Sequence, residues 1–400
     1  MAAIADKARY YLEQSVPQLR DFEAKNIFSQ AEIRNLVRKR EDFEHKVLSP
    51  GCKPADYLAY VAWERSLEKL RAKRCARLRI SQSTSHAGEG RVFGILERSI
   101  ARHPGSLELW REYLMFAKDV KATKRWRRVI TRALRMHPAK SELWVLAGKR
   151  AADNNDMSAA RNFFMRGARF CTKDSMVWVE YARCEMQWLE KMEARKNKKG
   201  GVNRAIAEQA ENDDDQMLFD EEDSEDDADE NGRLMVPNPD GQTKKVFDNS
   251  TAEKLEEGNP ALDGAIPMAI FDIAKKQPFF NAAAGEQFFD VFGEFPQVSS
   301  QPKIVQHVLD TMSELYPHNP AACNCFIRQP VLGVSIDSAA YPQALRETLS
   351  RLKSSLTSTS DKIQLARKTL AWMNPVLASE SLDPGLRMVL EYTAQTLPKP

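Results

Sequence analysis

The stretch that decides the fold is a segment that returns twice. It reads RSIARHPGSLELWREYLMFA at 98–117, RALRMHPAKSELWVLAGKRA at 132–151 and RGARFCTKDSMVWVEYARCE at 166–185. The step is 34 residues, and it is kept by Trp110, Trp144 and Trp178 and by Arg98, Arg132 and Arg166. A fixed period of this length marks an array of structural repeats, each of which contacts its neighbours along the chain.

Each repeat has the pattern of two helices. In the first, Trp110, Tyr113, Leu114 and Ala117 lie at i, i+3, i+4 and i+7, which is one apolar stripe. In the first two copies the second helix ends at a proline, which cannot donate a backbone hydrogen bond and clashes with the preceding turn, and the third copy has Cys171-Thr172 in place of His-Pro. Small residues at one equivalent position of the second helix are expected to let two helices approach closely: Ser99, Ala133 and Gly167. The pattern predicts an all-α fold, an α-solenoid of antiparallel helix pairs.

These residues resemble a known repeat. A first helix with Trp-x-x-Tyr, followed by Arg-Ala-Leu-x-x-His-Pro at 132–138, resembles the half-a-tetratricopeptide (HAT) repeat. HAT repeats occur mainly in proteins of RNA-processing complexes. We expect the aromatic side chains of the stripe to form the repeat core: Tyr57, Tyr60, Trp63, Trp110, Tyr113, Trp144, Trp178 and Tyr181.

Composition narrows the class of protein. The 400 residues are 42% hydrophobic, which is ordinary for a folded chain. No apolar run approaches the roughly 18 residues of a membrane span, and charged residues follow Met1-Ala2-Ala3 where a signal peptide would be apolar. The six cysteines are scattered, so we expect no disulfide framework and a reducing compartment.

The patterning divides the chain into four segments. Residues 1–55 form an N-terminal helical block, 56–190 hold the HAT repeats, 191–262 form a disordered acidic linker and 263–400 are a C-terminal helical region with a divergent HAT-like repeat.

Local signals predict the elements of the first half. We expect one helix over 5–23, kinked at Val16-Pro17, and a second that Ser29 and Glu32 open as a capping box. A long helix over 56–79 copies the first-helix pattern, and the tract 81–90 is expected to be a loop.

The acidic linker changes the meaning of the net charge. Of the 20 residues 211–230, 13 are Asp or Glu, and none is Lys or Arg. Such a block repels itself and cannot bury a core. The whole chain is +3 and this stretch contributes −13, so the rest carries +16, which suits an anionic partner. The linker either shields that charge or is solvated filler, and Ser224 is a candidate phosphorylation site within it.

Helical stripes resume after the linker. We expect helices over 268–274, 282–295 and 304–315, the last ending at Tyr316-Pro317 as earlier repeats end at His-Pro. The phenylalanines of the second of these helices are predicted to lie in the core. Three further helices are expected at about 342–357, 361–377 and 384–396.

Two basic clusters are candidates for contact with RNA phosphates, and the alternative is a solvated helix face in each case. The first holds Arg71, Lys73, Arg74, Arg77 and Arg79, and the second holds Lys124, Arg125, Arg127 and Arg128. Trp126, inside the second cluster, is expected to pack in the core.

Chemistry-bearing patterns are otherwise sparse. Cys323, Cys325 and His318 offer three possible metal ligands, but the spacing fits no common zinc pattern and no fourth ligand is evident, so we expect buried thiols and no metal. His103 and His137 are expected to cap helix carbonyls. No phosphate-binding glycine loop or nucleophile motif is present, so we predict neither enzymatic activity nor a cofactor.

The N-terminal half carries a second, more specific resemblance. Its opening block consists of the segments 10–13 (YYLE), 39–45 (KREDFEH), 53–58 (KPADYL) and 70–75 (LRAKRC). This block, within a resemblance over about residues 1–190, is similar to the U3 small nucleolar RNA-associated protein 6 family.

The resemblance implies a scaffold subunit of UTP-B, the B subcomplex of the small-subunit processome. Such a subunit acts in the nucleolus, in pre-18S ribosomal RNA processing and small ribosomal subunit assembly. The implied partners are WD-repeat propeller subunits, held through a docked peptide or helix, and the pre-ribosomal RNA and U3 snoRNA particle, contacted mostly indirectly. No membrane is implied. The alternative is a HAT scaffold of a splicing or mRNA 3′-end-processing complex, which the opening block disfavours.

Overall fold

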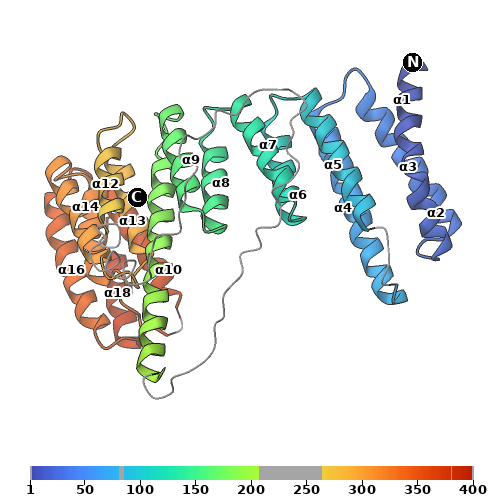
Figure 1. Cartoon of the computed structure of the whole chain (residues 1–400). Helices are drawn as coiled ribbons and strands as arrows, with labels where there is room; N and C mark the ends of the chain where they lie inside the picture. Colours follow the sequence, from blue (N-terminus) through green and yellow to red (C-terminus); the bar gives the residue numbers. More distant parts are fainter. Residues whose placement is uncertain (1, 81–84, 207–263, 380, 399–400) are drawn as a thin grey trace. The chain divides into compact units, whose positions relative to one another are not determined.

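The structure, a computed structural model, describes residues 2–80, 85–206, 264–379 and 381–398. Within these ranges the regular elements are helices and no strand occurs, so the all-α prediction is confirmed (Figure 1). The chain divides into two compact units, Met1–Cys171 and Thr172–Pro400. The division falls inside the predicted repeat segment 56–190, between the second and third tryptophan copies.

Unit 1 consists of consecutive helices. They are α1 (Ala2–Glu13), α2 (Val16–Ala24), α3 (Gln30–Leu48), α4 (Pro54–Leu78), α5 (Ser85–Arg102), α6 (Leu107–Asp119), α7 (Thr123–Met136), α8 (Ser141–Asp153) and α9 (Met157–Phe170). Successive helices pack as pairs, α4 with α5, α6 with α7 and α8 with α9. Short connections between packed helices make each pair antiparallel.

The start of the chain follows its local signals with one difference. The capping box is present, because Glu32 N donates to Ser29 Oγ at 3.3 Å and Ser29 N donates to Glu32 Oε2 at 2.8 Å. The single kinked helix expected over 5–23 is two helices. The break has a local cause, since Pro17 lies in the first turn of α2, where its missing N–H has no partner to lose.

The tract 81–90 is not a loop throughout. Helix α5 begins at Ser85, so residues 85–90 are helical, while 81–84 lie outside the described residues. The loop prediction was wrong because it rested on the Ser, Thr, His and Gly residues of this tract, which disfavour a helix interior only weakly. A Cβ at Gly88 would meet the carboxylate of Glu68, so α5 lies close to α4 at this position.

The repeats of unit 1 are joined through the carbonyls that follow their second helices. Pro104 O accepts a hydrogen bond from Trp110 Nε1 at 2.8 Å, and Pro138 O accepts one from Trp144 Nε1 at 2.8 Å. The end of the second helix in the same repeat as each tryptophan contacts these carbonyls too: His137 Nε2 lies 2.9 Å from Pro104 O, and Cys171 Sγ lies 3.7 Å from Pro138 O. Each of these carbonyls therefore contacts both helices of the following repeat: the tryptophan of its first helix and the end of its second helix.

The sequence predicted that His103 and His137 cap helix carbonyls. In the structure neither ring caps its own helix. The His137 ring reaches the carbonyl of the preceding repeat, and His103 Nε2 lies 3.4 Å from Cys52 Sγ. A ring at the end of a second helix projects beyond that helix toward the preceding turn, which explains the difference. The small residues of the second helices, Ser99, Ala133 and Gly167, are buried.

The expected core aromatics occupy the interior of their own units. Those of the repeat stripe that are buried are Tyr57, Tyr60, Trp110, Tyr113, Trp144, Trp178 and Tyr181, and Trp63 is half-buried. A Cβ at Gly148 would collide with the ring of Phe164, so α8 and α9 are in close contact around that phenylalanine.

Unit 2 begins with the third tryptophan copy. Its elements are α10 (Met176–Ile206), α12 (Ala265–Ala274), α13 (Ala282–Gly293), α14 (Gln301–Leu315), α15 (Pro320–Arg328), the 3₁₀ turn Gln329–Val331, α16 (Tyr341–Ser358), α17 (Lys362–Leu377) and α18 (Pro384–Thr396). Helix α10 packs against α12 and α13. Its Trp178 Nε1, unlike those of Trp110 and Trp144, has no hydrogen-bond partner in the described part of the chain.

Helix α10 corrects the predicted end of the repeats. It continues past Glu190 through a run rich in Lys, Arg, Glu and Ala up to Ile206, because these residues are good helix formers even without an apolar stripe. The predicted linker therefore begins within a helix. Its remainder from residue 207 onward, including Ser224, lies outside the described residues.

The C-terminal predictions correspond to observed elements. The expected helices over 268–274, 282–295 and 304–315 are α12, α13 and α14, and the last three are α16, α17 and α18. Phe288, Phe289 and Phe292 are fully buried, so the phenylalanine stripe lies in the core as predicted.

Replacing Trp110 tests the repeat core. Its side chain is only 2% exposed and its indole donates to Pro104 O, so Trp110→Ala removes packing and a hydrogen bond together. We expect the free energy of unfolding to fall by about 3–5 kcal/mol, measured by urea denaturation. Met115→Ala, on the exposed side of the same helix, is the control and should change it by less than about 1 kcal/mol. A loss below about 1 kcal/mol for Trp110→Ala would contradict this role.

Candidate functional site

The opening block builds a network of buried charges. Arg40 and Glu44, one turn apart on α3, are each only 1% exposed. Arg40 donates from Nε to Glu64 Oε1 at 2.8 Å and from Nη2 to Glu64 Oε2 at 3.0 Å. Glu64 is 2% exposed on α4, so the pair is a bidentate ion pair removed from water.

Glu44 connects the same network to α5 and α1. Its carboxylate accepts two hydrogen bonds from Arg98, at 2.8 Å each, and one from the Tyr60 hydroxyl at 3.0 Å. The Arg98 guanidinium also lies over the Tyr11 ring, 3.8 Å from its centroid. Burial raises the pKa of Tyr60 well above its usual value. The network therefore joins α3, α4 and α5 through charge-assisted hydrogen bonds and reaches α1 through a cation–π contact.

Sequence reasoning quoted this block without finding the network. Arg40 and Glu44 belong to the segments that resemble the family, but the resemblance does not indicate that their side chains are buried. A usable signal was present, since both flank Phe43 and the buried Val47 on one side of the helix. Arg40 and Glu44 are four residues apart beside an apolar stripe, and the helices that pack on them also carry charged residues on their stripes. This combination indicates that the charges are buried and paired across helices.

The first predicted basic cluster does not form a strip facing the solvent. Arg71 is 5% exposed and paired with Glu68, its Nε 2.8 Å from Glu68 Oε1. Arg74 holds Glu32 with two bonds, of 2.8 and 2.7 Å, and also donates to Ile27 O. Only Lys73, Arg77 and Arg79 are exposed. The helical period explains the split, because 71, 74 and 75 face α2 and α3 while 73 and 77 face away.

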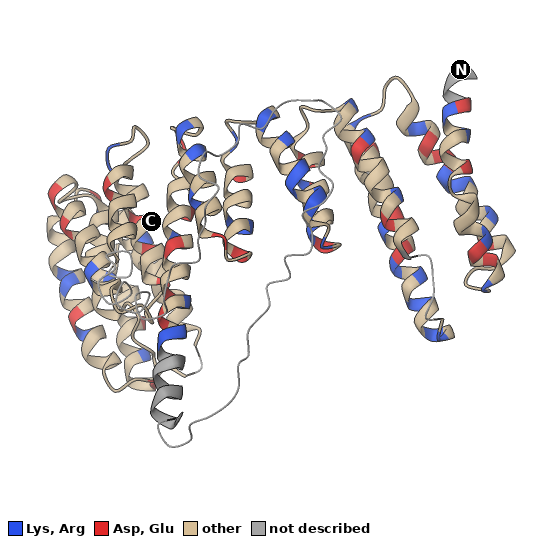
Figure 2. Cartoon of the chain, viewed as in Figure 1, with Lys and Arg blue, Asp and Glu red and all other residues tan. Residues whose placement is uncertain are grey.

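The second predicted cluster is exposed at all four positions, and the structure extends it. Helix α7 carries six basic residues and no Asp or Glu: Lys124, Arg125, Arg127, Arg128, Arg132 and Arg135. Figure 2 shows their blue bands along α7. The Arg125 guanidinium lies over the Phe93 ring, 4.6 Å from its centroid, and Arg132 pairs with Glu97. Trp126 is buried as expected.

A groove lies beside α7. Its cavity of about 480 Å³ is formed by α7, α8 and α9 and their connections. It is lined by Thr123, Trp126, Arg127, Ile130, Thr131, Ala147, Arg150, Ala151, Asn154, Asp156, Ala159 and Phe163. Arg127 and Arg150 make no ion pair with a described residue. The groove thus combines an apolar lining with two guanidinium groups.

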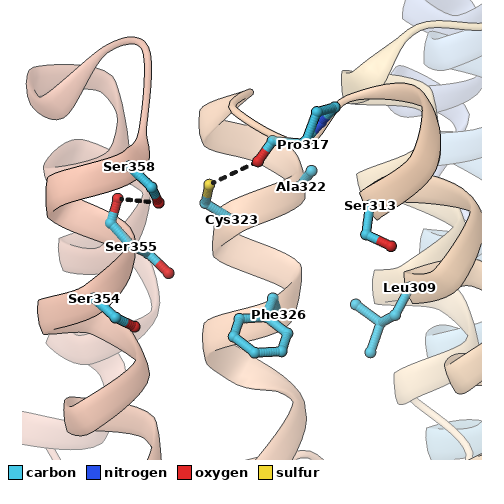
Figure 3. A pocket seen from close by; sticks show the side chains of 9 residues that line it. All are labelled: Leu309, Ser313, Pro317, Ala322, Cys323, Phe326, Ser354, Ser355 and Ser358. Atoms are coloured by element: carbon cyan, nitrogen blue, oxygen red, sulfur yellow. Dashed lines mark hydrogen bonds between the residues drawn. The ribbon is translucent and has the colours of Figure 1, made fainter.

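The three candidate metal ligands near α15 do not converge. Burial raises the pKa of the Cys325 thiol well above its usual value, and His318 Nδ1 lies 3.0 Å from Ser358 O. Cys323 Sγ lies 3.9 Å from Pro317 O. Both residues line a pocket of about 420 Å³ between α14, α15 and α16 (Figure 3). Within the described residues no group of three or more His, Cys, Asp or Glu side chains is arranged to hold a metal ion. None of the described helices is long and apolar enough to cross a membrane.

The buried network lies within a segment that matches a known protein family. Residues 12–102, which span α2 to α5 and the whole buried network on them, match the sequence model of the family "U3 small nucleolar RNA-associated protein 6". The resemblance predicted from the opening block is therefore confirmed.

Three curated relatives agree with this match. The U3 small nucleolar RNA-associated protein 6 of Schizosaccharomyces pombe is 36% identical over 196 residues, which are 48% of this chain and 40% of that protein. The homologues of Mus musculus and Homo sapiens are 28% and 29% identical over 189 and 193 residues, 46% of this chain and 32% of each of those proteins. The match thus covers less than half of the length of these relatives.

Breaking the buried ion pair should be costly. Arg40→Met leaves Glu64 buried without its bidentate partner, so we expect the free energy of unfolding to fall by about 3–5 kcal/mol, measured by urea denaturation. The double variant Arg40→Met, Glu64→Leu removes both charges and should recover part of the loss. Arg38→Met, exposed on the same helix, is the matched control and should change it by less than about 1 kcal/mol. If Arg40→Met behaves like this control, the pair does not organise the block.

The Glu32–Arg74 pair predicts a pH dependence. The hydrogen bonds from Arg74 lower the pKa of Glu32 from 4.5 to about 2. A carboxylate whose pKa is lower in the folded state stabilises the fold above its unfolded pKa and loses that effect as the pH falls toward its folded pKa. The Tm difference between the wild type and Glu32→Gln should therefore shrink as the pH falls from about 5 to about 2. Glu23→Gln, an exposed carboxylate on α2, is the control. A difference that does not depend on pH would contradict the pairing.

Proposed function

We propose that this chain is a non-catalytic scaffold subunit of the small-subunit processome, within UTP-B. Its role is to hold partners during pre-18S ribosomal RNA processing and small ribosomal subunit assembly in the nucleolus. The observation that carries this proposal is the coincidence of the family match at 12–102 with the buried charge network on α3, α4 and α5. The residues that resemble the family are thus the ones that fix the helices of this block against each other.

The repeat architecture supports a holding role. Stacked helix pairs expose long surfaces on which an extended peptide or a helix can lie. The groove of α7, α8 and α9 offers an apolar lining with Arg127 and Arg150, which suits a peptide that combines apolar and acidic side chains. In this proposal the peptide or helix belongs to a WD-repeat propeller subunit, and the U3 particle is reached mostly through such partners.

Recovery of RNA with the tagged full chain tests this function. Immunoprecipitation from nuclear extract should recover U3 snoRNA at least about tenfold above the spliceosomal small nuclear RNAs. Depletion of the protein should lower 18S ribosomal RNA and raise its precursors, and the intact chain should restore both. The untagged chain is the control for recovery.

The alternative function predicts a different result in the same experiment. A scaffold of splicing or mRNA 3′-end processing would recover spliceosomal RNAs or 3′-end factors in place of U3 snoRNA. That result, or depletion without any change in 18S precursors, would overturn the proposal.

A further inference from the structure

We propose that the second helices of two consecutive repeats, α7 and α9, form a surface that binds the phosphate backbone of RNA without reading its sequence. This second-helix basic face consists of Lys124, Arg128, Arg132 and Arg135 on α7 with Arg166 and Arg169 on α9. It deepens the proposed function, on which it rests, by naming RNA as a ligand that this chain contacts directly.

In the repeats α6–α7 and α8–α9 the charges are segregated between the two helices. Both α7 and α9 contain several basic residues and no Asp or Glu. The first helices that alternate with them, α6 and α8, carry both signs: Glu108, Glu112 and Asp119 on α6, and Glu142 and Asp153 on α8. Positive charge therefore collects on α7 and α9, where no carboxylate of the same helix offsets it.

The helical period directs these cations to solvent. Trp126, Ile130 and Ala133 are buried and define the inner side of α7. Arg128 and Arg135 lie on the opposite side, two turns or about 10 Å apart along the axis, and both are exposed. Neither makes an ion pair with a described residue. Their guanidinium groups are therefore available to an anionic ligand.

The repeat itself extends the face. Arg132 and Arg135 recur 34 residues later as Arg166 and Arg169, at equivalent positions of the next second helix, and both of these are exposed. The face begins at α7 because the preceding copy differs. Arg98, the equivalent of Arg132, is drawn inward to Glu44, and Ala101 stands where the later copies have arginine.

The chemistry of the face suits phosphates better than a protein surface. Five of its six cations are arginines, whose planar guanidinium groups match phosphate oxygens in a bidentate manner. Contacts to phosphates position a strand and carry no base information, so the expected binding is sequence-independent and sensitive to salt.

A salt titration of RNA binding tests the proposal. The probe is fluorescein-labelled 20-nucleotide oligouridine, bound to the full chain and followed by fluorescence anisotropy. The test variant is Arg128→Glu, Arg135→Glu, Arg169→Glu. The control variant Arg20→Glu, Arg34→Glu, Arg38→Glu makes the same change in net charge at exposed arginines of α2 and α3 that make no ion pair with a described residue. Because all six side chains are exposed, both variants should keep the wild-type Tm within about 2 °C.

We expect the test variant to lose at least about tenfold in affinity at low salt. Its slope of log K against log salt should be shallower by about 2, since three contacts on a single strand contribute about 0.7 each. The control should stay within about twofold of the wild type. An equal loss in both variants, or no binding by the wild type at low salt, would overturn the proposal. So would a test variant that loses binding to oligoglutamate while it keeps RNA binding, because the face would then be a protein surface.

The two proposals fail separately. If oligouridine binding depends on the second-helix basic face but the chain does not recover U3 snoRNA from extract, the proposed function is wrong and the surface stands. If U3 snoRNA is recovered and the purified chain binds no RNA, the scaffold stands and the surface falls.

Discussion

The buried charges of Arg40, Glu44 and Glu64 are the constraint on which unit 1 depends. A charge removed from water is tolerated only when it is paired and hydrogen-bonded, so each of these side chains dictates which helix must lie beside it. Arg40 requires α4, and Glu44 requires α5 through Arg98. Such pairs add little net stability compared with apolar packing, because desolvation offsets much of the attraction. These pairs fix one relative position of α3, α4 and α5. Apolar stripes alone would allow the helices to shift along each other.

Arginine serves two opposite purposes in this unit, and its surroundings decide which. Arg71 forms an ion pair with Glu68, and Arg74 forms one with Glu32, so neither guanidinium is available to a ligand. On α7 the neighbouring helices offer Glu97 to Arg132 but no carboxylate to Arg128 or Arg135. The balance of carboxylates on adjacent helices therefore separates structural arginines from those that can bind a partner, although both kinds lie in equally basic stretches.

The carbonyls after the second helices explain how the repeats tolerate divergence. In unit 1 they accept from a tryptophan six residues later and contact the end of the next second helix. In unit 2, Pro317 O lies near Cys323 Sγ, again six residues later, so α15 begins as a first helix does, with cysteine in place of tryptophan. The contact keeps its position while its residues change, because the position is set by the backbone geometry of the helix pair.

The sequence by itself determined the helix pairs, the buried aromatic stripe, the capping box at Ser29 and the resemblance carried by the opening block. These depend on residues within one or two turns of each other or on a fixed repeat step, and both are visible in a linear chain. Only the tertiary structure decided that residues 85–90 are helical, that α10 packs with α12 and α13, and that Arg71 and Arg74 are paired while Arg128 and Arg135 on α7 are exposed. These outcomes depend on partners far away in the chain, such as Glu64 for Arg40, 24 residues away, and Glu44 for Arg98, 54 residues away. The energy of a buried or paired charge depends on which helix lies opposite it, and local periodicity does not specify that neighbour.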